Sequence, residues 1–213
     1  MKKITLCAIL TGLFLLTGFQ GASQAQGLIN FGLKGGVNIA NISFDDFDEN
    51  ESRTGITVGA MLDIGIPMFP VGVETGLYYS QKGTTSSFSE SDGDLTITSD
   101  GTIKLDYLKI PVLAKVNVGP PGPFKPHFVA GPYAGFILNA ESETTFMGES
   151  FTEDISDDVE SMDLGLMVGV GADLNLMVGK INVQGRYSFG LTDVFEDEGS
   201  KNRVVSIVAG LSF

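Results

Sequence analysis

Along most of the chain, hydrophobic and polar residues alternate one by one within segments that end at glycine, proline or polar runs. In residues 55–66, for example, Ile56, Val58 and Leu62 fall on one side of the alternation and Asp63 falls on the other. A period of two residues is typical of a β-strand, because successive side chains point to opposite faces. The pattern predicts strands over eight segments: 28–41, 55–66, 71–82, 103–118, 124–138, 163–176, 180–191 and 203–213.

The links between these segments are of two kinds. The second, fourth and sixth links are short and rich in the turn formers proline and glycine, over residues 67–70, 119–123 and 177–179. The first, third, fifth and seventh links are longer or strongly polar, and they contain most of the 26 acidic residues. This alternation predicts an up-and-down antiparallel sheet with an even number of strands and all the acidic loops at one end.

The two faces of the strands differ in a way that separates two kinds of barrel. One face is aliphatic and bulky, and the other is small, polar or charged. A water-soluble, lipocalin-like barrel needs its large apolar residues inside, around a ligand. The polar face of this chain has too little side-chain volume for an apolar pocket, but it suits a narrow barrel whose aliphatic face contacts lipid. The sequence therefore predicts an all-β fold: an eight-stranded antiparallel up-and-down transmembrane β-barrel.

The alternation also predicts which charged residues point into this barrel. Charges that leave water are costly unless they are paired, so we expect an ion-pair network that fills the lumen. A gated pore or a proton path is the alternative, although an eight-stranded barrel is only wide enough for side chains to fill. The residues predicted to form the network are Lys34, Asp63, Glu74, Lys109, Lys115, Asp173 and Arg186, with Tyr78 and Gln184 on the same face.

Two prolines lie inside strands that should be central in the sheet. Pro111 and Pro132 each lack the N–H group that a strand ladder requires. Counting back from the link 119–123 places them within about one residue of opposite each other. We therefore expect a shared local irregularity or β-bulge there. A bulge would also change the inward position of Lys109 relative to Lys115.

The beginning of the chain has the pattern of a secretory signal peptide. Two lysines precede an apolar run over residues 4–19, and small residues follow at the spacing of a cleavage site. We expect cleavage between Ala25 and Gln26, which divides the chain into a signal peptide, 1–25, and an outer-membrane barrel domain, 26–213. A single-pass anchor is the alternative, but the apolar run is short for a membrane helix.

Composition limits the chemistry and the partners. The chain has 13 basic and 26 acidic residues, a formal net charge of −13, which argues against nucleic acid because phosphates require a basic surface. Loss of the signal peptide removes Cys7, the single cysteine, and with it thiol and disulfide chemistry. The expected partners of a monomeric barrel are outer-membrane lipid, lipopolysaccharide and the barrel-assembly machinery, and a protein partner at the acidic loops stays open.

The end of the chain fits the same picture. Phe213 closes a period-two aliphatic stripe, which we interpret as the C-terminal signal for outer-membrane assembly; an ordinary edge-strand residue is the alternative. Because short links lie on the periplasmic side of such barrels, we expect both mature termini on that side of the outer membrane.

The sequence offers little for catalysis or metal binding. His127 is the single histidine, and its place just after the link 119–123 predicts an ordinary residue at the periplasmic rim. No Gly-x-Ser-x-Gly motif occurs. Asp46, Asp48 and Asn50 have the spacing that opens an EF-hand loop, but Glu51 stands where that loop needs glycine. We therefore expect no enzyme, no metal and no cofactor, with a lipid-modifying enzyme as the third hypothesis.

Three segments resemble the strand motifs of the PorT-like outer-membrane β-barrel family of Bacteroidetes. They are YLKIPVLAK at 107–115, GPYAG at 131–135 and GRYSFGLTD at 185–193. The resemblance extends over the whole mature chain and implies an eight-stranded outer-membrane barrel. The family's named member is linked to protein secretion across that membrane, while most relatives have no assigned activity. We thus expect a structural or interaction role at the cell surface, with a small transporter or a secretion-associated, type IX-like component as the alternative.

Overall fold

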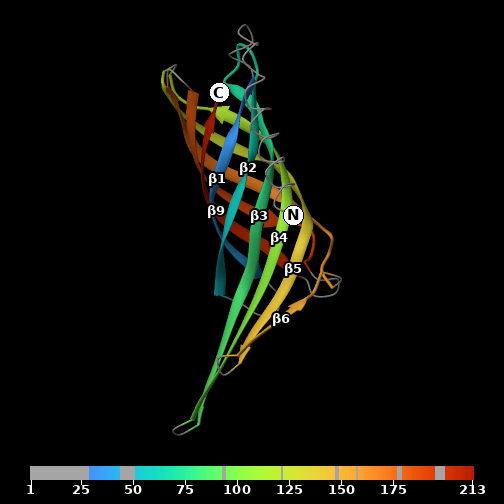
Figure 1. Cartoon of the computed structure of the whole chain (residues 1–213). Helices are drawn as coiled ribbons and strands as arrows, with labels where there is room; N and C mark the ends of the chain where they lie inside the picture. The colour runs from blue at the N-terminus through green and yellow to red at the C-terminus, as the bar shows by residue number, and fades with distance from the viewer. Residues whose placement is uncertain are drawn as a thin grey trace, which may run out of the picture.

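The computed structural model of the chain consists of β-strands (Figure 1) and describes residues 29–213 except 44–50, 93–94, 121, 147–148, 157, 177–178 and 195–199. Among these residues no helix is long and apolar enough to cross a membrane. The expected cleavage site at Ala25 and Gln26 lies outside the described residues, as do Asp46, Asp48 and Asn50. The strands are β1 (Ile29–Ser43), β2 (Glu51–Gly65), β3 (Val71–Asp92), β4 (Leu95–Asn117), β5 (Phe124–Phe146), β6 (Glu149–Asp154), β7 (Met162–Leu176), β8 (Gly179–Gly190) and β9 (Lys201–Ser212).

Eight of these strands form one closed antiparallel sheet. Each pairs with its neighbour along the chain, except that β5 pairs with β7 in the barrel wall and β6 lies outside the ring. The ring closes between β1 and β9, where Leu33 lies opposite Leu211 and Val37 opposite Ile207. Closure pairs the backbone groups of every wall strand on both sides, which is the condition for β-structure in lipid. The prediction of an eight-stranded up-and-down barrel is confirmed.

The two ends of the barrel differ. The turn end has short connections, such as that from Ile66 to Val71, where the Ile66 N–H donates to the Val71 carbonyl oxygen over 2.9 Å. The chain termini of the barrel meet at this end, where Phe31 and Phe213 exchange backbone hydrogen bonds of 3.2 and 2.9 Å. The opposite end, here the loop end, has the longer and more acidic connections. In Figure 1 the β3–β4 hairpin projects from the loop end far beyond the barrel wall.

Several strands are longer at the loop end than the alternation predicts. β3 and β4 stay paired as far as Asp92 and Leu95, and β5 continues to Phe146 and pairs there with β6. The sequence interpretation of the segments 83–102 and 139–162 as loops is therefore wrong for most of their length. These segments are rich in serine, threonine and carboxylates and have no continuous aliphatic face. They need none, because this part of the sheet extends past the hydrophobic wall and is held by backbone pairing.

The strands turn their bulky aliphatic face outward and their small or polar face inward, as the alternation predicts. Leu33 on β1 is 60% exposed, whereas its neighbour Lys34 is 1% exposed. The same contrast holds on β7, where Val170 is exposed and Asp173 is buried. An apolar wall around a polar interior is the arrangement of a membrane barrel and the opposite of a water-soluble one.

The two prolines interrupt the ladder without shifting its register. Pro111 lies opposite Tyr133, so Pro132 is one residue from opposite, as predicted. The β4–β5 register is the same on both sides of the prolines, and the register shift between these strands lies at Asp106 and Tyr107. The predicted local irregularity at the prolines is therefore present, but it is not a bulge, because the missing donors remove ladder bonds without inserting a residue. The inward positions of the two β4 lysines are unaffected.

One aromatic ring shows why glycine is needed on the inner face. The Tyr78 ring lies over two glycines, so that a Cβ atom on Gly59 would stand 2.8 Å from Tyr78 Cδ1, and one on Gly76 would stand 2.7 Å from Tyr78 Cε2. The same Cβ on Gly59 would also stand 2.1 Å from the Leu77 carbonyl oxygen. Carbon atoms do not approach this closely, so the ring occupies space that glycine leaves.

We predict that Gly59→Ala destabilises the barrel by about 1–3 kcal/mol or prevents closure, because the added methyl group overpacks the inner wall. Urea unfolding in detergent micelles, followed by heat-modifiable migration on a gel, measures the effect. Gly185→Ala is the matched control, since a Cβ at this outward position meets nothing within 4 Å. Equal stability of the two variants would contradict the packing argument.

Candidate functional site

Buried charged side chains form three groups of contacts in the lumen, which we describe as layers along the barrel axis. The turn-side layer contains Asp63, Lys115 and Asp173, the central layer contains Lys34, Glu74 and Arg186, and the loop-side layer contains Lys82, Lys109 and Asp163. All nine side chains are buried, with relative exposures of 0–6%. Side chains from β1, β2, β3, β4, β7 and β8 thus converge on one axis because inward positions recur at every second residue.

Together with Lys180 at its edge, the turn-side layer has two cations and two carboxylates. The Lys115 ammonium donates to Asp63 Oδ2 over 2.9 Å and to Asp173 Oδ2 over 2.7 Å. Lys180 donates to Asp63 Oδ2 over 2.6 Å, and Asn182 Nδ2 donates to Asp173 Oδ1 over 2.5 Å. Each carboxylate therefore accepts at least two hydrogen bonds, which offsets much of the cost of its burial.

The central layer places two cations on one carboxylate. Glu74 Oε1 accepts hydrogen bonds from Lys34 Nζ over 2.7 Å and from Arg186 Nη2 over 2.5 Å. Gln184 bridges the same group: its Nε2 donates to Glu74 Oε2 over 2.8 Å, and its Oε1 accepts from Arg186 Nε over 2.7 Å. Glu74 is the hub of this layer, because every other member contacts it directly.

The loop-side layer is built on aromatic rings as well as charge. Lys82 forms an ion pair with Asp163 and lies 4.5 Å from the centre of the Tyr107 ring. Lys109 Nζ lies 4.4 Å from the Tyr133 ring centre and 3.5 Å from Ser188 Oγ. No carboxylate oxygen of a described residue lies within 4.0 Å of Lys109 Nζ. Cation–π contacts thus provide part of the stabilisation of buried cations that ion pairs provide in the other layers.

An apolar cluster lies beyond the loop-side layer. Leu105 and Ala140, from β4 and β5, pack there with Val159 and Val194, which come from the connections that follow β6 and β8. Backbone hydrogen bonds hold these connections in place, because Glu160 N–H donates to the Val194 carbonyl oxygen over 2.9 Å. The connections therefore contribute side chains to the barrel interior as well as to the surface.

The structure places the residues predicted from sequence as follows. It brings Lys34, Glu74 and Arg186 into one contact group and Asp63, Lys115 and Asp173 into another, and it leaves Lys109 apart from both. Tyr78 and Gln184 are also buried in the lumen. At the chain end, Phe213 is 72% exposed and its backbone pairs with Phe31.

Sequence reasoning missed four lumen residues and misplaced a fifth. Lys82 and Asp163 stood at the borders of predicted strands, Lys180 followed a short link, and Asn182 is uncharged. Extending the inward parity of Glu74 to residue 82 would have found the first of these. The prediction of His127 as a rim residue is wrong: its side chain is 1% exposed and its Nε2 lies 2.9 Å from Gln184 Nε2.

The lumen offers little free chemistry. Its carboxylates each contact at least one cation, so none is available as an accessible general base. Within the part of the chain that the structure describes, no group of three or more histidine, cysteine, aspartate and glutamate side chains could hold a metal ion.

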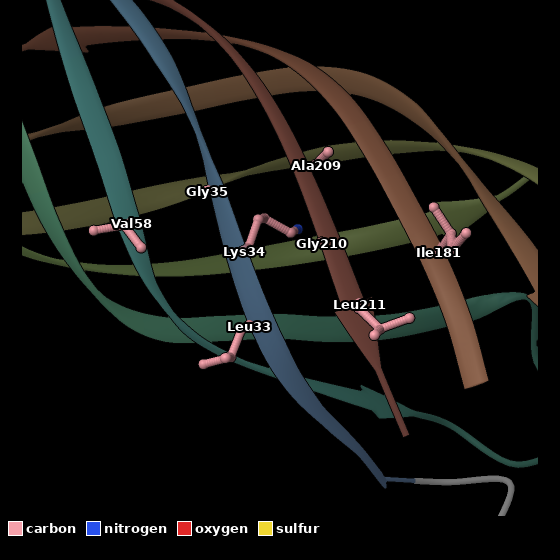
Figure 2. A pocket seen from close by; sticks show the side chains of 8 residues that line it. All are labelled: Leu33, Lys34, Gly35, Val58, Ile181, Ala209, Gly210 and Leu211. Carbon is pink, nitrogen blue, oxygen red and sulfur yellow. The ribbon is translucent and has the colours of Figure 1, made fainter. Parts of the chain in front are cut away.

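The outer wall carries a broad hollow at the seam of β1 and β9, which Figure 2 shows. Gly35 and Ala209 lie opposite each other there and leave space between Leu33, Val58 and Leu211. The hollow is apolar and opens on the outer, aliphatic face of the barrel. It fits the hydrocarbon environment that this wall requires.

The closed sheet, its apolar outer wall and its charged interior define an integral outer-membrane type of β-barrel. The chain belongs to the family described as outer membrane protein beta-barrel domain, whose model matches residues 22–196. The protein is therefore an outer-membrane β-barrel protein. A comparison with curated proteins gives no match.

Several solved barrels are similar to this chain. Ail, the attachment invasion locus protein of Yersinia pestis, has a TM-score of 0.46 and 15% identity, over 86% of this chain and 98% of that one. Neisserial surface protein A has a TM-score of 0.45 and 14% identity, over 86% and 97%. The N-terminal barrel domain of Pseudomonas aeruginosa OprF has a TM-score of 0.36 and 12% identity, over 84% and 97%.

We predict that Glu74→Gln destabilises the barrel by about 3–5 kcal/mol, because it leaves Lys34 and Arg186 buried without their shared carboxylate. Urea unfolding in micelles measures the loss. The matched control is Glu143→Gln, which breaks the half-exposed ion pair with Lys104 and should cost at most about 1 kcal/mol. This pair lies on the projecting sheet, which is the part of the sheet beyond the barrel wall formed by the outer parts of β3, β4 and β5 together with β6. A Glu74 variant as stable as the Glu143 variant would contradict the role of Glu74 as hub.

Proposed function

We propose that the protein is a monomeric, non-enzymatic barrel whose lumen is closed and which acts at the cell surface through its acidic loop end. The observation that carries the proposal is the filling of the lumen. The charged side chains of its three layers are almost fully buried, and a cavity between the central and loop-side layers has a volume of about 10 Å³. That volume is about the least that one water molecule needs.

Ion conduction through this lumen would require the layers to separate. Breaking a buried ion pair costs several kcal/mol, and the three layers lie in series along the axis. The apolar cluster at the loop end adds a further barrier, because Leu105, Val159 and Val194 offer no hydrogen bonds to a hydrated ion. A closed lumen is consistent with a structural role for the network, in agreement with the limited width of eight strands.

The projecting sheet supplies a surface for interaction. β6 is the last strand of this sheet, and among the described residues it pairs with β5 alone. All six of its residues are exposed, including Phe151 at 62%. A free strand edge is a template for an added strand from a partner.

The charge on this sheet favours a basic partner. Asp154 of β6 lies directly opposite Glu141 of β5, and Lys104 of β4, opposite Glu141 on its other side, forms its ion pair with Glu143. The like-charge pair is unfavourable, and a further cation would relieve it. Hydrogen bonds from the Ser156 hydroxyl and backbone N–H lower the pKa of Asp154 from its usual value, which keeps it ionised. We propose an extended, basic protein segment as the partner of the β6 edge, while lipid and lipopolysaccharide surround the barrel wall.

The finer family placement is also proposed. The three segments that resemble PorT-like barrels contribute inward side chains to the lumen: Lys109 and Lys115 from the first, Tyr133 from the second and Arg186 from the third. We propose membership of that branch of the family on this basis. The second candidate function is a small transporter or a secretion-associated component. The third is a lipid-modifying enzyme, and unchanged lipid A in a deletion strain would rule this hypothesis out.

Planar bilayer recordings test the closed lumen. We predict no steady single-channel openings of the purified barrel, because the ion-pair layers block the axis, whereas a general porin in the same bilayers gives regular steps. Steady openings that vanish when Arg186 is changed would overturn the closed-lumen proposal in favour of a transporter.

Cysteine labelling tests the orientation. We propose that the loop end faces outward and the termini face the periplasm, so Thr152→Cys on β6 should react with a membrane-impermeant maleimide in intact cells. Met68→Cys, at a fully exposed turn-end residue, should react only after the outer membrane is permeabilised. The opposite result would invert the proposed orientation, and the unmodified chain serves as the blank.

A further inference from the structure

The backbone of β6 shows which groups are free at the open edge of the projecting sheet. The N–H of Ile155, the residue that directly follows β6, donates to the Ala140 carbonyl oxygen of β5 over 3.0 Å. The backbone groups of successive residues in an antiparallel strand point alternately to its two sides. Every second residue back from Ile155 therefore bonds to β5, and the N–H and C=O groups of Ser150, Thr152 and Asp154 point to the open edge.

One face of β6 has an aromatic ring between two carboxylates. Glu149 and Glu153 lie two residues before and after Phe151, so the three side chains share this face. Thr144 of β5 lies directly opposite Phe151, and Gly101 of β4 lies opposite Thr144, so the sheet offers the ring no large side chain along this row. Phe151 is accordingly 62% exposed. An apolar neighbour directly opposite the ring can come only from the open edge.

The two carboxylates on this face have no counter-charge. Glu149 and Glu153 are both exposed, and no cationic group of a described residue lies within 4.0 Å of either carboxylate. Glu143 of the neighbouring β5 differs, because it forms an ion pair with Lys104. The Phe151 face of β6 thus presents a negative charge, an apolar ring and a second negative charge, in that order along the edge.

β6 is a poor partner for a second copy of itself. In the antiparallel register that places Phe151 opposite Phe151 of the second copy, Glu149 lies opposite Glu153. The register one residue away places Glu149 opposite Asp154. Like charges directly opposite each other destabilise a sheet, and charges on an edge strand are a common protection against self-association. The charges of β6 therefore favour an added strand from a different, basic chain.

We propose that the β6 edge selects an extended segment in which one apolar residue has a basic residue two positions away on either side. This inference rests on the proposed function, because it specifies the sequence pattern of the partner at the same edge. Antiparallel addition places the apolar residue opposite Phe151 and the basic residues opposite Glu149 and Glu153. A third basic residue lies opposite Asp154. Pairs of opposite charge and pairs of aromatic with apolar side chains are the cross-strand pairs that stabilise a sheet.

Two capped peptides of equal composition test the pattern. Lys-Lys-Thr-Val-Thr-Lys places its valine opposite Phe151 and its lysines opposite the three carboxylates, whereas Lys-Val-Thr-Lys-Thr-Lys exchanges the valine with the second lysine. NMR titration of the barrel in zwitterionic micelles should show shift changes at the β6 amides, with binding of the first peptide about fivefold or more tighter. Equal affinities would show attraction by charge alone and would overturn the pattern.

Methylated peptides test the use of the backbone edge. In the first peptide the N–H of the third residue would point to Thr152, so N-methylation there should abolish binding. The N–H of the fourth residue points away from β6, and N-methylation there should keep the affinity within about twofold. Equal binding of the two methylated peptides would overturn docking at the edge.

Variants of the barrel assign the recognition to individual side chains. Phe151→Ser and Glu153→Gln should each weaken binding of the first peptide by about two- to fivefold. Glu160→Gln is the matched control, because it removes an exposed carboxylate beyond the end of β6 and should change the affinity less. Equal losses in the Glu153 and Glu160 variants would overturn the assignment.

The results separate failure of the pattern from failure of the proposed function. If N-methylation of the third residue blocks binding but both unmethylated peptides bind equally, the pattern is wrong and docking at the edge remains. If neither peptide changes the β6 amides, the pattern and the proposed partner are both wrong. A concentration-dependent dimer of the barrel that the first peptide does not dissociate would assign the edge to a second copy and would overturn both.

Discussion

Every polar backbone group that enters a bilayer must find its partner inside the protein, and the rest of this structure depends on that constraint. Strands satisfy it only when the sheet closes, here through the pairing of β1 with β9. Closure with eight strands produces a narrow interior, which has room for side chains and for little else. The inner residues must therefore be small where a ring lies over them, as Gly59 is under Tyr78, and paired where they are charged.

The constraint applies only to the part of the chain in lipid, which explains what the sequence could and could not predict. Alternation predicted all eight wall strands and the inward side of residues such as Lys34 and Glu74, since lipid demands an aliphatic residue at every second position. It missed the outer half of the β3–β4 hairpin and the whole of β6, where all six residues are exposed and the sequence shows no aliphatic stripe.

The prediction of lumen residues failed where the environment of a side chain depends on its position along the barrel axis and not only on the face of the strand that it occupies. The position of His127 near a turn suggested a rim, yet its side chain is buried in the lumen, with its Nε2 2.9 Å from Gln184 Nε2. Asp163 belonged by composition to an acidic connection, yet it is the carboxylate that Lys82 contacts. Sequence gives the face of a strand on which a residue lies, but the partner across the barrel depends on strand tilt and register, which have no local signal.

A charged interior also answers a problem that an aliphatic interior would create. If both faces of the strands were apolar, a shift of one residue in register would exchange the faces at little cost, and several barrels of equal stability would compete. With Lys34, Glu74 and Arg186 on one face, the same shift would place each of them in hydrocarbon. The ion pairs need not add net stability to have this effect, because the penalty falls on the wrong registers. The lumen network thus specifies which face is inside.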